Sequence, residues 1–478
     1  MNYRMISHTL GSVLACLAVL MLLPLLAGLC YGENVLAFVI AIGITAAVSF
    51  ILRGFKPRST DIYAREGFVI VGLAWISMSL LGALPFVISG EIPNYIDAVF
   101  ETVSGFTTTG ASILTDVESM SHAGLFWRSF THWIGGMGVL VFVMAVLPMS
   151  GEHSMHIMRA EVPGPTVGKL VPRAKETAKI LYLMYMALTA LETILLKAGG
   201  MSFFDALLHA FGTAGTGGFS TKAASVGAFN SLYVEMVISV FMLLFSVNFN
   251  LYYLLLIGRV KDVLKNEELH WFLAIVLFSV LTIAVNISAM YGSFAEALRH
   301  AFFNVSTIIS TTGFGTEDFN LWPQYSKWLL ILLMLIGACA GSTGGGLKVS
   351  RVIMLLKSAE AELKQMIRPR SVTRIQLEGK RVETGAVHAV STFFVMYIMI
   401  LLVCTLLISV DGFDMETSFA GALACLSNIG PGMSLVGPTG SYSFFSALSK
   451  IVLSLAMLIG RLEIYPILLL FNRHTWKR

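Results

Sequence analysis

Four glycines, each at the end of a repeated pattern, could place main-chain carbonyl groups where they bind a cation. A fourteen-residue pattern occurs four times, at residues 97–110, 205–218, 300–313 and 417–430. Each copy runs from apolar or small residues into a short tail rich in Ser, Thr or Asn, and the tails end at Gly110, Gly218, Gly313 and Gly430. Glycine allows a positive φ, so successive carbonyls can turn toward a common axis. Four tails around one axis would form a ring of carbonyl oxygens able to bind a dehydrated monovalent cation.

The apolar part of each pattern predicts a helix too short to cross a bilayer. About ten residues at 1.5 Å each give roughly 15 Å, which is half the hydrocarbon thickness of a membrane. The chain must then turn back, and irregular backbone is tolerated at that depth only where it is buried in protein or lines a water-filled path. We therefore expect four re-entrant half-helices whose C-terminal ends direct partial negative charge toward the cation.

The composition is that of a polytopic membrane protein. Of 478 residues, 56% are hydrophobic and 13% charged, and the net charge of +4 gives little support to a nucleic-acid partner. Ten apolar spans are predicted, at residues 9–30, 35–52, 67–90, 126–148, 179–198, 232–258, 270–290, 326–356, 385–410 and 444–471. The first is long enough to cross and no cleavage pattern follows it, so we interpret it as a retained helix rather than a signal peptide.

Basic residues predict the orientation of the chain. An even number of spans puts both termini on one side, and the side richer in Lys and Arg is cytoplasmic. Most of the 32 basic residues fall at the termini or in alternate connections: Arg4, Arg53, Lys56, Arg58, Arg65, Arg159, Lys169, Arg173, Lys175, Lys179, Arg259, Lys261, Lys265, Arg351, Lys357, Lys364, Arg368, Arg370, Arg374, Lys380, Arg381, Arg473, Lys477 and Arg478. The half-helices therefore enter from outside.

Acidic residues surround the half-helices on this outer side. They could concentrate cations at the mouth of a pore, although each could also simply be tolerated at a hydrated surface. The residues concerned are Glu91, Asp97, Glu101, Asp116, Glu118, Asp205, Glu317, Asp318, Asp411 and Asp414.

The predicted fold class is an all-α membrane protein with ten transmembrane helices. Each half-helix is bracketed by two spans, so the last eight spans divide into four pseudo-repeated helix, pore-loop, helix units around one pore. The expected boundaries are 1–66 for two extra N-terminal helices, then 67–178, 179–269, 270–382 and 383–478 for the four repeats.

Glycines interrupt the eighth span. Gly337, Gly341, Gly344, Gly345 and Gly346 lie there with Ser342 and Thr343. At roughly 1 kcal/mol each, five glycines within ten residues should unwind a helix. A phosphate loop is excluded because Leu347 separates the last glycine from Lys348 and no nucleotide domain surrounds the segment. We interpret the segment as a flexible gate beneath the ring; the alternative is close helix packing.

An arginine lies deep in the tenth span. A charge at that depth is expensive and marks a pathway or a partner. We expect Arg461 to face the cavity, where it would oppose cation passage or hydrogen bond to carbonyls of the glycine segment. The alternative is that it snorkels to the cytoplasmic interface. Glu463, two residues on, should point to a different helix face.

Enzyme chemistry finds no support in the sequence. No carboxylate pair, metal-ligand cluster or nucleophile arrangement stands out, and no organic cofactor is expected. Five cysteines have no disulfide or metal spacing and are interpreted as small packing residues: Cys16, Cys30, Cys339, Cys404 and Cys425.

Several motifs together resemble the Trk/Ktr/HKT superfamily of potassium transporters, and most closely its bacterial TrkH/TrkG branch. They are the tails TTTG, GTGG, STTG and NIGPG, RSFTHWIGGMG at 128–138, GSTGGGLK at 341–348 and the arginine of the last span. The resemblance covers essentially the whole chain. It implies potassium uptake across the bacterial cytoplasmic membrane, with K⁺ as the transported ion.

The resemblance also implies roles for residues. The potassium filter would comprise Thr108, Thr109, Gly110, Thr216, Gly217, Gly218, Thr311, Thr312, Gly313, Asn428, Ile429 and Gly430. The gate would comprise Gly337, Gly341, Ser342, Thr343, Gly344, Gly345, Gly346 and Arg461. Members form homodimers and bind a cytosolic, nucleotide-binding ring of TrkA type. Residues 357–381 would be a docking surface for that ring, unless their charge is ordinary positive-inside bias.

Selectivity and mechanism follow from the same resemblance. In the plant branch, serine at the first filter position accompanies sodium selectivity, so Gly110 favours potassium, with rubidium as a surrogate. One glycine per tail predicts few carbonyl sites and modest discrimination against sodium. A proton- or sodium-coupled symporter remains an alternative, with Glu192 as the candidate coupling residue; a structural membrane protein is a second.

Overall fold

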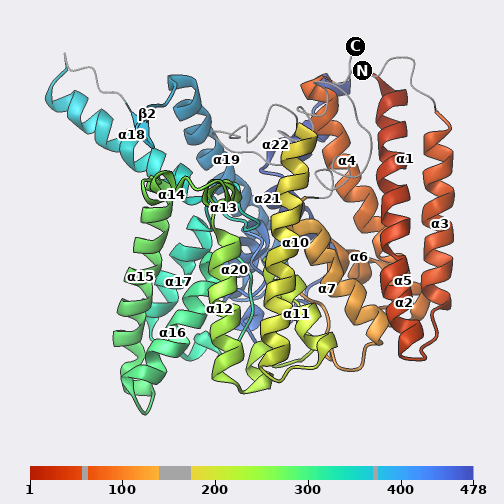
Figure 1. Ribbon diagram of the computed structural model, residues 1–478. Coiled ribbons are helices and arrows are strands. Elements are labelled where there is room, and N and C mark those ends of the chain that lie inside the picture. Colours follow the sequence, from red (N-terminus) through yellow and green to blue (C-terminus); the bar gives the residue numbers. More distant parts are fainter. Residues whose placement is uncertain (56–62, 139–173, 370–374, 477–478) are drawn as a thin grey trace.

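The computed structural model describes residues 1–55, 63–138, 174–369 and 375–476. These residues are mostly helical, and long helices lie side by side with both chain ends at the same edge of the molecule (Figure 1). A mostly helical chain agrees with the predicted class. The even-span argument likewise expects the two termini to share a side.

Six helical stretches are long and apolar enough to cross a membrane, by length and composition of the described residues. They are Tyr3–Cys30, Leu36–Arg53, Arg65–Ser89, Ala178–Ala198, Glu267–Met290 and Thr384–Asp411, and they agree with six predicted spans. The helices in them are α1 (Tyr3–Leu20), α2 (Leu22–Cys30), α3 (Leu36–Arg53), α4 (Ala64–Gly82), α5 (Leu84–Ser89), α10 (Ala174–Ala198), α15 (Glu267–Ile287) and α19 (Thr384–Ile408). Helix α1 packs on α3 and α4 at one side of the molecule (Figure 1).

Four short helices occupy the predicted half-helix positions. They are α6 (Tyr95–Phe106), α11 (Phe203–Gly215), α16 (Phe294–Ile309) and α20 (Met415–Leu426), of 12 to 16 residues. Each begins with a side-chain cap, from Asn94, Ser202, Ser293 or Asp414, and each has an acidic residue in its first turn. The caps accept hydrogen bonds from free N–H groups of the first turn, and the acidic side chains interact favourably with the positive end of the helix dipole. Together they fix where each helix starts.

The Asp414 cap illustrates how firmly such a start is held. The hydroxyl and the backbone N–H of Thr417 donate to its carboxyl at 2.5 and 3.0 Å. The hydroxyl bond is the largest influence in lowering the pKa of this carboxyl. A carboxylate that accepts such bonds is stabilised in its charged form.

Each short helix is followed by a second apolar helix. These are α7 (His122–Gly136), α12 (Leu232–Ser246), α17 (Gln324–Ile336) and α21 (Ala447–Arg461). The remaining helices are α13 (Phe249–Leu256), α14 (Val260–Leu264), α18 (Val349–Ile367), α22 (Tyr465–Phe471) and α23 (Arg473–Trp476), with short 3₁₀ turns at Ser225–Phe229, Ser288–Met290, Phe319–Leu321, Ser409–Asp411 and Ser434–Val436. Residues 139–148 of the predicted span 126–148 lie outside the described residues.

Three predicted spans are broken, and the break in span 326–356 is the one that its glycines predict. Span 232–258 bends by 92° between α12 and α13. Residues 337–348 separate α17 from α18, and positive φ values at Glu463 (52°) and Ile464 (71°) end the helix run of 444–471. The count of ten spans and the repeat boundaries stay predictions.

The break after α12 has a clear physical cause. The carbonyl of Ser246 accepts from the N–H of Cys339 at 3.1 Å, and that of Phe245 accepts from Thr343. Asn248 then caps the next helix by accepting from the N–H of Asn250. The carbonyls at the end of α12 thus pair with the glycine segment instead of continuing the helix, a tertiary effect that apolar composition cannot reveal.

One small ribbon occurs in the described residues. Strands β1 (Gln376–Leu377) and β2 (Lys380–Arg381) pair antiparallel, with Gln376 opposite Arg381. Glu378 and Gly379 both have positive φ (54° and 72°), as a tight primed hairpin turn requires. This β1–β2 hairpin lies at the same edge of the molecule as the chain ends, where α18 projects outward (Figure 1).

Candidate functional site

The four glycine-ended tails meet in a closed ring. A methyl group on Gly110 would overlap the carbonyl oxygen of Gly217, one on Gly218 that of Thr312, and one on Gly313 that of Ile429. A methyl group on Gly430 would lie 2.6 Å from the carbonyl oxygen of Thr109, which closes the circle. Each glycine therefore packs against the residue that precedes the next glycine. The sequence prediction that Gly110, Gly218, Gly313 and Gly430 converge is correct.

Backbone conformation repeats around this ring. The glycines have φ between 75° and 93°, and the residues two positions earlier, Thr108, Thr216, Thr311 and Asn428, have φ between 54° and 60°. A left-handed conformation costs a non-glycine residue about 1–2 kcal/mol. Four such residues in equivalent places mean that surrounding packing imposes the shape of the tails.

Four carbonyl oxygens in the ring have no hydrogen-bond donor among the described residues. Those of Thr109, Gly217, Thr312 and Ile429 accept no hydrogen bond from the described part of the chain. All four residues are buried. A buried carbonyl without a partner costs about 1–3 kcal/mol. A set of four converging carbonyls in this state is suited to coordinating a cation.

Side chains brace the tails from behind. The hydroxyls of Thr107 and Thr109 are 2.8 Å apart, and those of Ser310 and Thr312 2.7 Å apart. The amide of Asn428 donates to the Thr109 hydroxyl and to the Met457 carbonyl, both at 2.9 Å. The first bond joins the fourth tail to the first directly, so hydroxyl and amide side chains are used to hold the ring and the carbonyls remain available.

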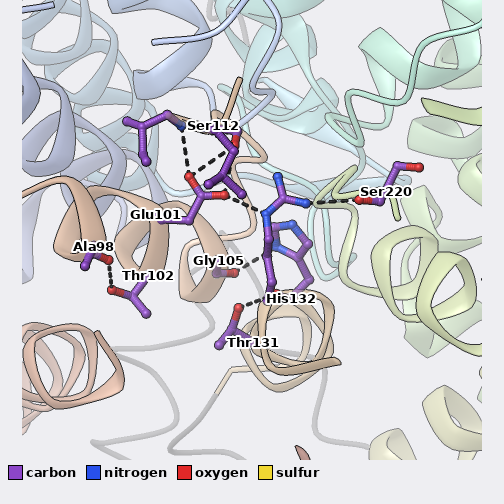
Figure 2. A network of polar contacts seen from close by, with 11 residues as sticks. Ala98, Glu101, Thr102, Gly105, Ser112, Thr131, His132 and Ser220 are labelled. Carbon is purple, nitrogen blue, oxygen red and sulfur yellow. Dashed lines mark hydrogen bonds and ion pairs between the residues drawn. The ribbon is translucent and has the colours of Figure 1, made fainter. Parts of the chain in front are cut away.

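A buried ion pair supports the first two tails (Figure 2). The Arg128 guanidinium on α7 donates to Glu101 on α6 at 2.6 Å and to the Ser220 carbonyl at 3.1 Å, and it lies 3.5 Å from the centre of the Phe219 ring. Glu101 also accepts from Ser112 and from the N–H of Ile113. Removing one partner of such a pair would leave an uncompensated buried charge.

This pair corrects one sequence prediction. Glu101 was one of the acidic residues that could have attracted cations at a hydrated mouth, but it is 1% exposed and engaged by Arg128. Spacing alone could not distinguish a buried carboxylate from an exposed one. The missed signal was Arg128 itself, because an arginine at the start of an apolar span calls for a partner.

Nearby, the His132 ring nitrogen Nδ1 contacts the Gly105 carbonyl at 2.9 Å and fixes α7 against α6 (Figure 2).

Further ion pairs join successive units around the ring. Glu235 on α12 pairs with Arg299 on α16 at 2.6 Å, and Lys327 on α17 approaches Glu416 on α20 at 3.9 Å. Lys450 on α21 pairs with Asp97 on α6 at 2.7 Å. Asp97 is therefore another predicted mouth carboxylate that is engaged by a cation. These contacts link three of the second helices, α12, α17 and α21, to the next short helix around the ring.

The glycine segment lies directly against two of the tails. We name residues 337–348 the glycine loop. The N–H of Gly345 donates to the Thr311 hydroxyl at 2.6 Å, and a methyl group on Gly344 would lie 2.9 Å from the Ser310 carbonyl. A methyl group on Gly345 would overlap the Ser427 carbonyl. Glycine is thus required here for close approach of two backbones.

Arg461 reaches this loop from the end of α21. It donates to the carbonyl of Thr343 at 2.7 Å and to those of Gly135 and Gly136 at 2.5 and 2.7 Å. It therefore joins the glycine loop to the end of α7, rather than snorkelling away. Glu463 pairs with Arg351 instead. This agrees with the prediction that Glu463 and Arg461 point to different helix faces.

Other predicted gate residues shape the loop internally. The Ser342 hydroxyl donates to the Cys339 carbonyl at 2.6 Å, and Gly337 (φ 71°) packs against the backbone of Gly345 and Gly346. The Phe249 N–H donates to the Gly341 carbonyl at 3.0 Å. The sequence reasoning missed Lys348, whose buried ammonium donates to the Gly344 carbonyl. Its signal was a lysine two positions after the last glycine of an intramembrane run.

Comparisons with known proteins agree with this geometry. The TrkH family model, described as a cation transport protein, matches residues 33–477. The Trk system potassium uptake protein TrkH of Salmonella typhimurium is 38% identical over 485 residues, and TrkG of Escherichia coli K12 is 34% identical over 489; the alignments cover all of this chain and 100% and 99% of these relatives. The crystal structure of the potassium transporter TrkH from Vibrio parahaemolyticus is similar with a TM-score of 0.90 at 34% identity, over the full length of both chains. These findings confirm the family resemblance, and the chain belongs to the TrkH family of cation transport proteins.

Proposed function

We propose that this protein carries potassium into the cell through a gated pore whose filter is the glycine ring. The observation that supports this most is a set of four carbonyls of buried residues, Thr109, Gly217, Thr312 and Ile429, that accept no hydrogen bond within the part of the chain that the structure describes. Carbonyl oxygens can replace the water around a dehydrated alkali cation. The relatives named above are potassium uptake proteins, which makes K⁺ the preferred cation.

The filter consists of the three residues that end each tail. These are Thr108, Thr109 and Gly110; Thr216, Gly217 and Gly218; Thr311, Thr312 and Gly313; and Asn428, Ile429 and Gly430. Gly110 leaves the first position open for a larger ion, and the braces behind the tails hold the ring at a fixed width. The short helices end at the tails and add their negative dipole ends to the site.

The glycine loop is the gate of this pore. It contacts the third and fourth tails, and Arg461 and Lys348 place two cationic groups beside its carbonyls. Positive charge below a cation filter opposes passage, and a loop rich in glycine can change conformation at little steric cost. The ring therefore selects the ion, and the loop opens the pore.

The membrane and its two faces complete the proposal. The side carrying both termini and the β1–β2 hairpin is cytoplasmic, in line with the basic residues there. Of the basic residues used for that prediction, Lys56, Arg58, Arg159, Lys169, Arg173, Arg370, Arg374, Lys477 and Arg478 lie outside the described residues. The repeat boundaries given above define four units around the pore, with residues 1–66 outside them.

Partners are proposed on the same cytoplasmic side. A TrkA-type nucleotide-binding ring would dock on residues 357–381, and the protein would form a homodimer with one pore per subunit. Exposed apolar residues on one face of α18, Leu356, Leu363 and Ile367 (56%, 61% and 78% exposed), offer a surface for one of these contacts. As a member of a transport family, the protein is not an enzyme.

Radioactive rubidium uptake into vesicles holding the purified chain tests this function. We expect saturable uptake that potassium suppresses more strongly than sodium does. Uptake no greater than that of empty vesicles in every nucleotide state, with and without a regulatory ring, would contradict transport and favour a structural role. Equal suppression by sodium and potassium would contradict a selective ring.

A coupled symporter is the second candidate, favoured by one buried carboxylate. Glu192 on α10 is fully buried beside Thr213 of α11, three positions before Thr216 in the second tail. An ionisable group at such a place is a candidate for coupling ion movement. A reversal potential that shifts with a pH gradient, and no longer shifts in Glu192→Gln, would support symport; one insensitive to the gradient would support the channel.

A further inference from the structure

The first turn of α15 contacts both the glycine loop and the β1–β2 hairpin. It contains three consecutive polar residues, Asn266, Glu267 and Glu268, which we name the α15 bracket. Asn266 caps the helix by accepting from the N–H of Leu269 at 2.8 Å. The bracket is therefore held at a fixed start of a long apolar helix.

Glu268 ties together both ends of the glycine loop region. One of its carboxylate oxygens accepts from the N–H of Ala340 at 2.8 Å and from the N–H of Ser350 at 3.0 Å. Ala340 lies within the loop and Ser350 in the first turn of α18. Glu268 is 5% exposed, so these bonds are shielded from water. A charged acceptor strengthens both bonds, and the N-terminal end of α18 favours the negative charge.

Its neighbours face the hairpin and α18. Glu267 pairs with Lys357 of α18 at 2.5 Å and accepts from the N–H of Glu378 at 3.2 Å. The Asn266 amide donates to the Glu378 carboxylate. Lys357 also donates to the Gln376 carbonyl at 2.7 Å. Asn266 and Glu267 thus bond the hairpin turn, and the next residue, Glu268, bonds the loop. Lys357, the partner of Glu267, bonds the first strand.

We propose that the α15 bracket holds the glycine loop closed and releases it when the β1–β2 hairpin is displaced. Glu268 is the positioning residue of this device: it touches the loop backbone and no ion. Movement of the hairpin would reach Glu268 through Asn266 and Glu267, which bond to Glu378 in the hairpin turn. The inference rests on the proposed role of the glycine loop as a gate, and it gives the cytoplasmic segment 357–381 a physical route to that gate.

Rubidium influx into vesicles holding the full chain alone, without a regulatory ring, tests the bracket. Glu268→Ala removes the acceptor of both N–H groups and should raise influx at least about fivefold by shifting the loop toward its open state. Glu268→Gln keeps an acceptor oxygen and should stay within about twofold of the wild type. Glu267→Gln weakens the pairing of residue 267 with Lys357 and should raise influx less than Glu268→Ala does. The double variant Glu267→Gln/Glu268→Ala should not exceed Glu268→Ala, because both changes act along one route.

Matched controls separate this device from general destabilisation. Asp262→Asn removes the exposed Arg259–Asp262 pair beside α14, just before the bracket in the sequence, and should leave influx unchanged. The potassium-to-sodium ratio should also be unchanged in every bracket variant, because the ring is untouched. A raised influx with a lost ratio would mean a damaged filter and would overturn the inference. If Glu268→Ala does not fold, Glu268→Asp applies the same test, because its shorter side chain cannot serve both N–H groups; it too should raise influx.

Arg461→Ala, measured in parallel, distinguishes failure of the proposed bracket from failure of the proposed gate. Raised influx in Arg461→Ala with wild-type influx in the Glu268 variants would overturn the bracket and leave the gate standing. Wild-type influx in all of them, with ordinary rubidium transport, would overturn the gate and the bracket together.

Discussion

The glycine ring and the glycine loop are both irregular backbone at the centre of the protein, but they are held in different ways. The ring is braced largely by its own tails, through pairs such as Thr107 with Thr109 and Asn428 with Thr109. The loop is held by side chains from elsewhere, chiefly Arg461 and Glu268. Bonds within the tails fix the ring in one geometry, whereas the loop can leave its contacts with distant side chains and form others. A filter needs the first arrangement and a gate the second.

A methyl group in the ring should have the largest effect. Gly218→Ala places a side chain on the Thr312 carbonyl at a φ of 75°, so it should lower rubidium flux at least about a hundredfold through several kcal/mol of overlap and strain. Gly412→Ala is the matched control, because Gly412 has a φ of 80° with nothing within 4 Å of the added methyl. Equal fluxes in the two variants would contradict the ring as the conduction site.

Freeing the loop should have the next largest effect, in the opposite direction. Arg461→Ala removes three charged hydrogen bonds and should raise flux without regulator by about tenfold, with an unchanged potassium-to-sodium ratio. Deletion of residues 344–346 should act in the same direction. Arg461→Lys, which keeps the charge but loses the fork of donors, should fall between. If neither Arg461→Ala nor the deletion alters flux, the gate lies elsewhere.

A polar side chain in the ring should alter selection as well as lower flux, because its Cβ overlaps a ring carbonyl as in Gly218→Ala. Gly110→Ser adds a polar side chain toward the Gly217 carbonyl and should raise sodium permeation relative to potassium by about threefold or more, because the ring becomes narrower. Reversal potentials under mixed sodium and potassium gradients measure this ratio. A ratio equal to that of the wild type would remove Gly110 from the filter.

The smallest expected effect concerns the contact between the two regions. Thr311→Val removes the hydroxyl that accepts from the Gly345 N–H, a bond worth about 1 kcal/mol, and should raise flux two- to fivefold. Thr405→Val removes a hydroxyl bonded within α19, away from the ring, and serves as the control. An effect of Thr311→Val no larger than that of Thr405→Val would mean that ring and loop act independently.

The sequence predicted the ring better than its surroundings. The four short helices and the convergence of Gly110, Gly218, Gly313 and Gly430 followed from a local pattern, because glycine position and helix length are properties of a few adjacent residues. The unwinding at 337–348 followed from glycine content in the same way. The filter and gate roles of these residues stay proposals.

Contacts between distant segments were beyond that reasoning. The bend between α12 and α13 depends on carbonyls given to the glycine loop, and the burial of Glu101 depends on Arg128 from another helix. Glu268 looked like an ordinary acidic residue at a helix start. Its importance depends on Ala340 and Ser350, which lie more than seventy positions away.

Anomalous scattering from rubidium in crystals of the protein tests the central claim most directly. We expect a peak on the axis of the ring, within coordinating distance of the carbonyl oxygens of Thr109, Gly217, Thr312 and Ile429, and its loss when potassium replaces rubidium. Rubidium bound only elsewhere, with these four carbonyls hydrogen-bonded to ordered water at high rubidium concentration, would contradict the account.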